Sequence, residues 1–74
     1  MIDPKELVIL YRAHTVYNNN SSVKSVIKFL EPRIARSDLG NMDFELQCAE
    51  SWWKSLPEDR RIILHSQYVQ FLET

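Results

Sequence analysis

The sequence predicts an all-α fold, a compact bundle of four short helices in a single domain that spans residues 1–74. Apolar residues recur at intervals of three and four along most of the chain, which is the period of a helix. The chain has one glycine and three prolines, so it has few of the residues that tight β-hairpin turns require. It is 45% hydrophobic and 26% charged with a net charge of −1, which is typical of a globular protein.

The first helix is expected at about residues 4–17. Asp3 is placed to cap this helix, Pro4 suits its first position, and Glu6 lies in the first turn, where the helix dipole favours an acid. The polar run Asn18–Asn20 should end it, because asparagine side chains compete for backbone hydrogen bonds. Two apolar strips run along this helix: Leu7, Leu10, Tyr11, His14 and Tyr17, and Ile9, Ala13 and Val16.

A second helix is expected over residues 22–36, with Ser21 or Ser22 as its cap. Pro32 lacks an N–H group and its ring clashes with the preceding turn, so it should kink or end the helix. The apolar stripe nevertheless stays in phase beyond the proline, which favours a bent helix. Gly40, in the following loop, is suited to a left-handed C-cap. The residues of the stripe are Val23, Val26, Ile27, Leu30 and Ile34.

The third helix is expected over residues 43–55, with Asn41 or Asp43 as its cap. Successive side chains are about 100° apart on a helix, and the apolar residues therefore fall on two adjacent seams. Together these seams are wider than the usual core stripe. One seam is Phe44, Cys48 and Trp52, and the other is Leu46, Ala49, Trp53 and Leu56.

The fourth helix is expected over residues 57–72 and should form a hairpin with the third. Ser55 and Glu58 have the spacing of a capping box, and Pro57 should end one helix and set the start of the next. Loss of the Ser55 cap should then cost about 0.5–2 kcal/mol. This helix also has two apolar seams: Ile62, His65, Val69 and Leu72, and Leu64, Tyr68 and Phe71.

The third and fourth helices thus carry more apolar surface than their neighbours in so short a chain readily cover. Trp52 and Trp53 are adjacent, so they point in different directions and cannot serve one core equally. Because tryptophan is enriched at protein interfaces, one of the two is expected at a surface, and Trp52 is preferred because its seam is thinner. The residues predicted to bind a partner are Trp52, Trp53, Tyr68, Phe71 and Phe44.

The predicted function is a non-catalytic protein–protein interaction module, which binds another protein, a second copy as a homodimer, or both. A small chain that works by occupying another surface suits a regulator, adaptor or inhibitor, including those of phages and mobile elements. That last association is an analogy. Residues 24–36 have a charge excess of +3 and residues 38–50 an excess of −4, so these patches could orient a partner or align two copies head to tail.

The basic segment supports an alternative, a small helical DNA-binding transcriptional regulator. Its second and third helices would form a helix-turn-helix, and its cations would contact phosphates. Acids at the start of the third helix oppose this interpretation, because they would repel phosphates. The basic residues are Lys24, Lys28, Arg33 and Arg36.

No catalytic residue, metal site or cofactor is expected. Cys48, His14 and His65 lie on apolar faces without zinc-type spacing, so a buried thiol and partly buried imidazoles are favoured over a nucleophile pair. One glycine cannot build a phosphate-binding loop. A signal peptide is not expected, and no apolar run approaches the roughly 20 residues of a membrane span. A lone cysteine fits a reducing compartment, so the expected location is the cytoplasm.

Overall fold

The computed structural model describes residues 2–17 and 22–73. Within them the chain is helical, and the predicted all-α fold of four short helices is confirmed. A π-helical turn, η1 (Arg12–Val16), extends the first helix, and a 3₁₀ turn, η2 (Leu39–Met42), precedes the third. The four α-helices are α1 (Pro4–Tyr11), α2 (Val23–Ala35), α3 (Asp43–Ser55) and α4 (Glu58–Glu73).

Side-chain caps begin α1 and α2. The Oδ1 atom of Asp3 accepts hydrogen bonds from the backbone N–H groups two and three residues later, at 2.8 and 3.4 Å, and Pro4 occupies the first turn. The Oγ atom of Ser22 likewise accepts from the N–H group three residues later, at 3.1 Å. Asp3 and Ser22 are therefore confirmed as caps. The alternative cap Ser21 and the predicted stop at Asn18–Asn20 lie outside the described residues.

Helix α2 continues through Pro32 to Ala35. Pro32 is exposed, so its ring lies on the solvent side of the helix. Ile34, two residues later, is buried, as the phase of the apolar stripe predicts. The expectation that the helix extends beyond the proline is confirmed, while the kink stays a prediction.

The segment between α2 and α3 differs from the prediction. Gly40 has no positive φ and lies within η2, so it is not a left-handed C-cap. Its N–H group donates to the Oδ1 atom of Asp38 at 2.9 Å, and this bond begins η2. The turn leads directly into α3, whose N-cap is Met42 without a side-chain hydrogen bond. The predicted caps Asn41 and Asp43 are therefore wrong.

The predicted capping box before α4 is also wrong. The carbonyl of Pro57 accepts from the N–H group of Arg61 at 3.1 Å, so Pro57 is the N-cap and Glu58 the first helical residue. Ser55 belongs to the last turn of α3, where its hydroxyl donates to the carbonyl of Trp52 at 2.6 Å. Helix α4 begins two residues later than a Ser55 cap requires.

Replacing Ser55 by alanine is accordingly expected to change the free energy of unfolding by no more than about 0.5 kcal/mol, as for other exposed residues. Urea denaturation followed by circular dichroism measures this change. A loss of about 1 kcal/mol or more would instead indicate that Ser55 caps α4.

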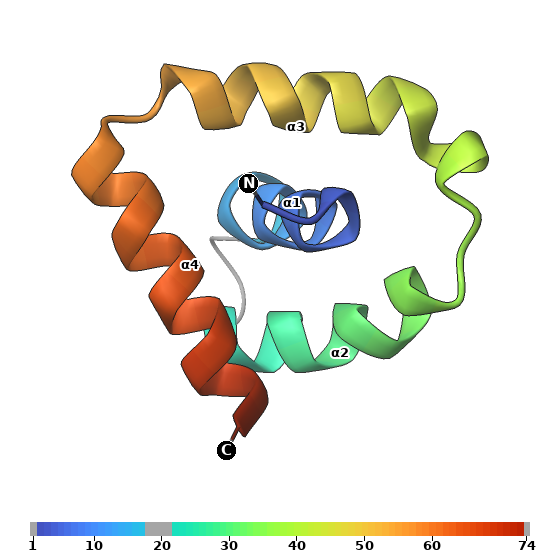
Figure 1. Ribbon diagram of the computed structural model, residues 1–74. Coiled ribbons are helices and arrows are strands. Elements are labelled where there is room, and N and C mark those ends of the chain that lie inside the picture. Colours follow the sequence, from blue (N-terminus) through green and yellow to red (C-terminus); the bar gives the residue numbers. More distant parts are fainter. Residues whose placement is uncertain (1, 18–21, 74) are drawn as a thin grey trace.

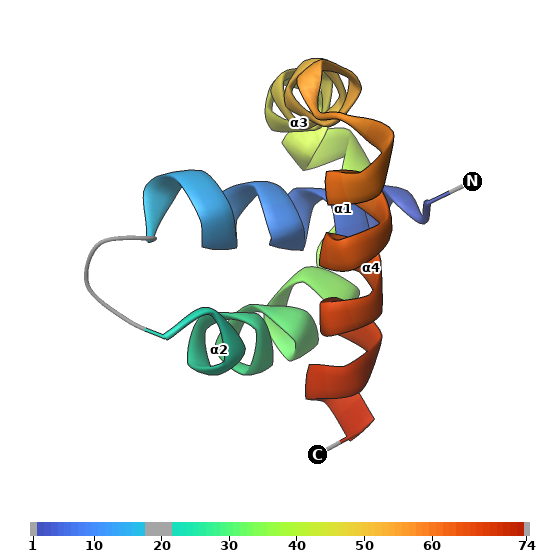
Figure 2. The ribbon, with the colours of Figure 1, turned by 90° about the vertical axis from the view of Figure 1, so that its left-hand side faces the viewer.

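Helix α1 lies at the centre of the molecule. Figure 1 shows it end-on, surrounded by α2, α3 and α4, and Figure 2 shows it between α3 and α2. Its residues Leu7, Val8, Ile9 and Leu10 are all buried. Four consecutive residues point in all directions around a helix. The rest of the chain therefore encloses α1 on all sides over these four residues.

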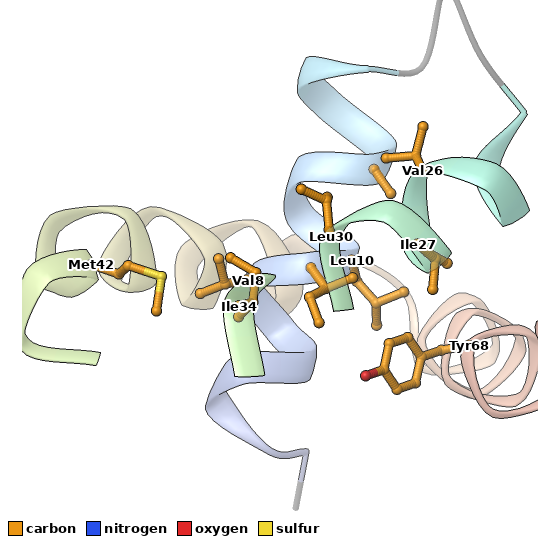
Figure 3. Close-up of a cluster of buried hydrophobic side chains, with 10 residues drawn as sticks. Val8, Leu10, Val26, Ile27, Leu30, Ile34, Met42 and Tyr68 are labelled. Carbon is orange, nitrogen blue, oxygen red and sulfur yellow. The ribbon is translucent and has the colours of Figure 1, made fainter. Parts of the chain in front are cut away.

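The core joins α1 to α2, η2 and α4 (Figure 3). Helices α3 and α4 form an open hairpin at Leu56-Pro57, and its arms diverge in Figure 1. The first arm packs against α1 and the second against α2. No helix of the described residues is long and apolar enough to cross a membrane. The buried core residues are Val8, Ile9, Leu10, Ala13, Val26, Ile27, Leu30, Ile34, Met42 and Tyr68.

Candidate partner-binding face

Trp52 is packed against the first helical segment. Its ring meets that of Tyr11 edge-on, with 5.8 Å between centroids, and lies nearly parallel to the imidazole of His14 at 6.2 Å. His14 belongs to the π-helical turn η1, whose extra width helical periodicity does not anticipate. Trp53 is packed in a similar way, since its ring lies 6.0 Å from that of Trp52 and both tryptophans are half-buried against the core. These contacts therefore do not decide which tryptophan binds a partner.

Burial against Trp52 gives His14 a measurable effect on stability. Burial lowers the pKa of His14 below its usual 6.5, and the positive charge of Arg60 adds to this effect. As the pH falls, the unfolded chain therefore binds a proton at His14 before the folded protein does. The contribution of His14 to the free energy of unfolding is complete above pH 6.5 and is lost as the pH falls below this value. Urea midpoints should decrease from pH 7.5 to 5.5, and His14→Gln should make this decrease smaller. An equal decrease in both proteins contradicts the assignment.

Trp53 borders two shallow depressions, of about 370 and 290 Å³. The first lies between Trp53 and the start of α4, and the second between Trp53 and the start of α1. Ile2 also lines both, so they form one continuous surface over three helices. We call this surface the Trp53 face and define it by Ile2, Leu46, Trp53, Arg61, Ile62 and His65.

The exposed seam of α4 extends this face. Ile62 is 59% exposed, and Val69 and Leu72 are also exposed. With His65 they repeat at intervals of three and four residues, so they lie along one side of the helix. The other seam of α4 holds the buried residues Leu64 and Tyr68, and α4 packs against α2.

Tyr68 belongs to that other seam, and its role as a partner-binding residue stays a prediction. It is buried in the core together with Leu64. Burial is the main cause that raises the pKa of Tyr68 to about 12, with smaller effects from nearby carboxylates. Phe71 is half-buried and packs against the core. Neither residue therefore lies on the Trp53 face.

Phe44 stands apart from the Trp53 face. It is 80% exposed, and it precedes Trp53 by nine residues in α3, which places it on the opposite side of the helix. The structure thus does not gather the five predicted partner-binding residues into one site. Among them, Trp53 lines the two depressions, together with Ile2 in both and Ile62 in the first.

Ile2 is a residue that the prediction missed, although the sequence carries a signal for it. It directly precedes the cap Asp3, and Leu7 follows at the position where a hydrophobic staple places its second member. Ile2 and Leu7 both line the second depression. The staple therefore brings an apolar side chain from before α1 onto the Trp53 face.

An ion pair and a contact between a histidine and a carboxylate link distant elements and were also not anticipated. The guanidinium of Arg12 donates to both carboxylate oxygens of Glu45, at 2.8 and 2.5 Å, and joins η1 to α3. The imidazole of His65 meets the carboxylate of Glu6 and joins α4 to α1. Both pairs connect residues far apart in the chain, which local sequence patterns cannot reveal. The pair with Arg12 also shows that the charge of Glu45 is balanced by a guanidinium, so Glu45 does not act as a free acidic patch.

The Arg12–Glu45 pair is expected to contribute to stability. It is bidentate and partly buried, so its coupling energy should reach about 1 kcal/mol, the upper end for exposed pairs. A double-mutant cycle with Arg12→Gln and Glu45→Gln measures this energy from urea unfolding. Additive losses in the double variant would contradict it.

The basic residues lie on the outer side of α2. Lys24, Lys28, Arg33 and Arg36 are all exposed. The two arginines donate hydrogen bonds to carbonyl groups of the helix itself, one turn earlier. Helix α1 lies between α2 and α3 (Figure 2), so α2 and α3 do not form a helix-turn-helix.

Cys48 and the histidines are not gathered into a catalytic group. Cys48 is a half-buried free thiol on α3, while His14 stacks on Trp52 and His65 meets Glu6. Among the described residues, no cluster of histidine, cysteine and acidic side chains could hold a metal ion.

Comparisons of the chain with models of protein families, with curated proteins and with solved structures find no match. Its function is therefore argued from its own surface.

Proposed function

We propose that the chain is a non-catalytic protein–protein interaction module that binds a protein partner through the Trp53 face. The observation that carries this proposal is the pair of depressions beside the half-buried Trp53, which are lined from α1, α3 and α4 and bordered by the exposed Ile62. A small regulator, adaptor or inhibitor in the cytoplasm is the role that we assign to it.

The composition of the Trp53 face supports a protein partner. It combines a tryptophan, isoleucines and an arginine, and tryptophan and arginine are common anchors of protein interfaces. The depressions are open and shallow, which suits side chains of a partner better than an enclosed small molecule.

The experiment compares two substitutions on neighbouring residues of α4. Ile62 lines the Trp53 face, whereas Ile63, which is 45% exposed, points about 100° away from it. The tagged protein and the variants Ile62→Asp and Ile63→Asp are used to capture proteins from cells of the native host. Circular dichroism of each variant confirms that it is folded.

The wild-type protein and Ile63→Asp should retrieve the same partner in stoichiometric amount, and Ile62→Asp should lose it. Loss in both variants, or retention in both, would show that binding does not use the Trp53 face. Absence of a stoichiometric partner for the wild-type protein contradicts the proposed function.

A DNA-binding transcriptional regulator is the second candidate, supported by the four exposed cations of α2. Such binding should weaken steeply with salt, and Lys24→Ala with Lys28→Ala should reduce it. Absence of duplex retardation at low salt ends this alternative. It has less support than the interaction module, because α2 and α3 lack the helix-turn-helix arrangement.

A further inference from the structure

A second apolar surface lies where the end of η1 meets α2, and it shares no lining residue with the Trp53 face. Phe29 is 52% exposed there, and it lines a depression of about 370 Å³ together with Tyr17, Ser25 and Val26. The guanidinium of Arg33 lies 3.8 Å from the centre of the Phe29 ring. We call this surface the Phe29 socket and define it by Tyr17, Val26, Phe29 and Arg33.

The Phe29 socket is positively charged. Arg33 borders it directly, because its guanidinium lies over the Phe29 ring, and Lys28 and Arg36 are exposed on the same helix. Glu31 is the only acid of α2, and it acts on the pKa of Tyr68 in α4, so it lies toward α4 rather than beside the socket. An apolar depression with a basic border is complementary to an apolar side chain with acidic neighbours.

The same chain presents such a side chain at the start of α3. Phe44 is 80% exposed, the largest exposed fraction among the exposed large hydrophobic residues of the described chain. Asp43 directly precedes it, and residues 38–50 contain no lysine or arginine. Glu45 of this segment is paired with Arg12, but Asp43 is exposed, so the phenyl ring of Phe44 projects from a segment of net negative charge, whereas the Phe29 socket lies within a basic one.

We infer that the Phe29 socket of one copy takes Phe44 of a second copy, in a head-to-tail contact between identical chains. Each copy has one Phe44 and one socket, and the two are different surfaces, so the contact is heterologous. Such contacts propagate into open chains when the rotation between copies does not close a ring. This contact involves neither Trp53 nor Ile62 and is independent of the proposed partner binding.

Sedimentation velocity at increasing protein concentration tests the contact. The mean mass of the wild-type protein should rise beyond that of two chains at low salt and fall when salt is added. Phe44→Ala and Phe29→Ala should each stay monomeric, because each lacks one half of the contact. An equimolar mixture of the two should form a dimer and nothing larger, because only one intact Phe44 and one intact socket can meet.

Ile63→Ala is the matched control, since Ile63 is an exposed apolar residue outside both surfaces. It should associate like the wild-type protein, and circular dichroism should show that all variants are folded. A wild-type protein that is monomeric throughout overturns the inference. So does self-association that survives Phe44→Ala, or a mixture that stays monomeric. If Ile62→Asp lost self-association while Phe44→Ala and Phe29→Ala kept it, self-association would be assigned to the Trp53 face. That result would overturn the inference as well.

Discussion

Replacing Leu10 by alanine is expected to abolish most of the stability of the fold. Leu10 is fully buried. It belongs to α1, the helix that α2, α3 and α4 surround in Figure 1. Removal of a buried leucine side chain costs about 2–5 kcal/mol, whereas a core of this size supplies only about 3–5 kcal/mol in total. Circular dichroism at 25 °C should show a largely unfolded variant, or a urea midpoint near zero.

Leu72→Ala is the matched control for this prediction. Leu72 is chemically identical but exposed on α4, so its replacement should change the free energy of unfolding by no more than about 0.5 kcal/mol. Similar losses in the two variants would contradict the central position of α1.

The second large effect is expected for Ile34→Ala, which should lower the free energy of unfolding by about 2–5 kcal/mol. Ile34 is buried although it follows Pro32 in the same helix. Urea unfolding of this variant measures the loss, with Ile63→Ala as an exposed control of the same size. An unchanged midpoint for Ile34→Ala would show that the last turn of α2 does not pack on the core.

The helices themselves were readily predicted from the sequence. The stripe from Val23 to Ile34 and the cap Asp3 are local signals, and local hydrogen bonds determine where such elements begin and end. The errors concern the first residues of α3 and α4, where the backbone geometry depends on neighbouring segments. Met42 takes the position expected for Asn41 or Asp43, because η2 leads directly into α3.

The central position of α1 was harder to predict. Leu7, Ile9 and Leu10 were assigned to two strips and Val8 to neither, although four consecutive buried residues indicate a helix enclosed on all sides. The apolar surplus was assigned entirely to α3 and α4, whereas α1 covers part of α3. The apolar side chains of α3 and α4 that remain exposed are Phe44, Ile62, Ile63, Val69 and Leu72.

The choice between the two tryptophans could not be made from periodicity. Both lie on apolar seams of α3, and only the π-helical turn η1 brings His14 against Trp52. The depressions beside Trp53 likewise depend on Ile2 and on the angle between α3 and α4. These are relations between distant segments, which a single sequence does not specify by local pattern.

The most direct test of the account is a nuclear magnetic resonance footprint of the captured partner on the isotope-labelled protein. The Trp53 face should respond, with shifts at Ile2, at the indole N–H of Trp53 and at Ile62. The indole N–H of Trp52 and the amides around Phe29 should stay unchanged. Shifts centred on Trp52 or on α2, with Trp53 unaffected, would contradict the proposal that this chain binds its partner through the Trp53 face.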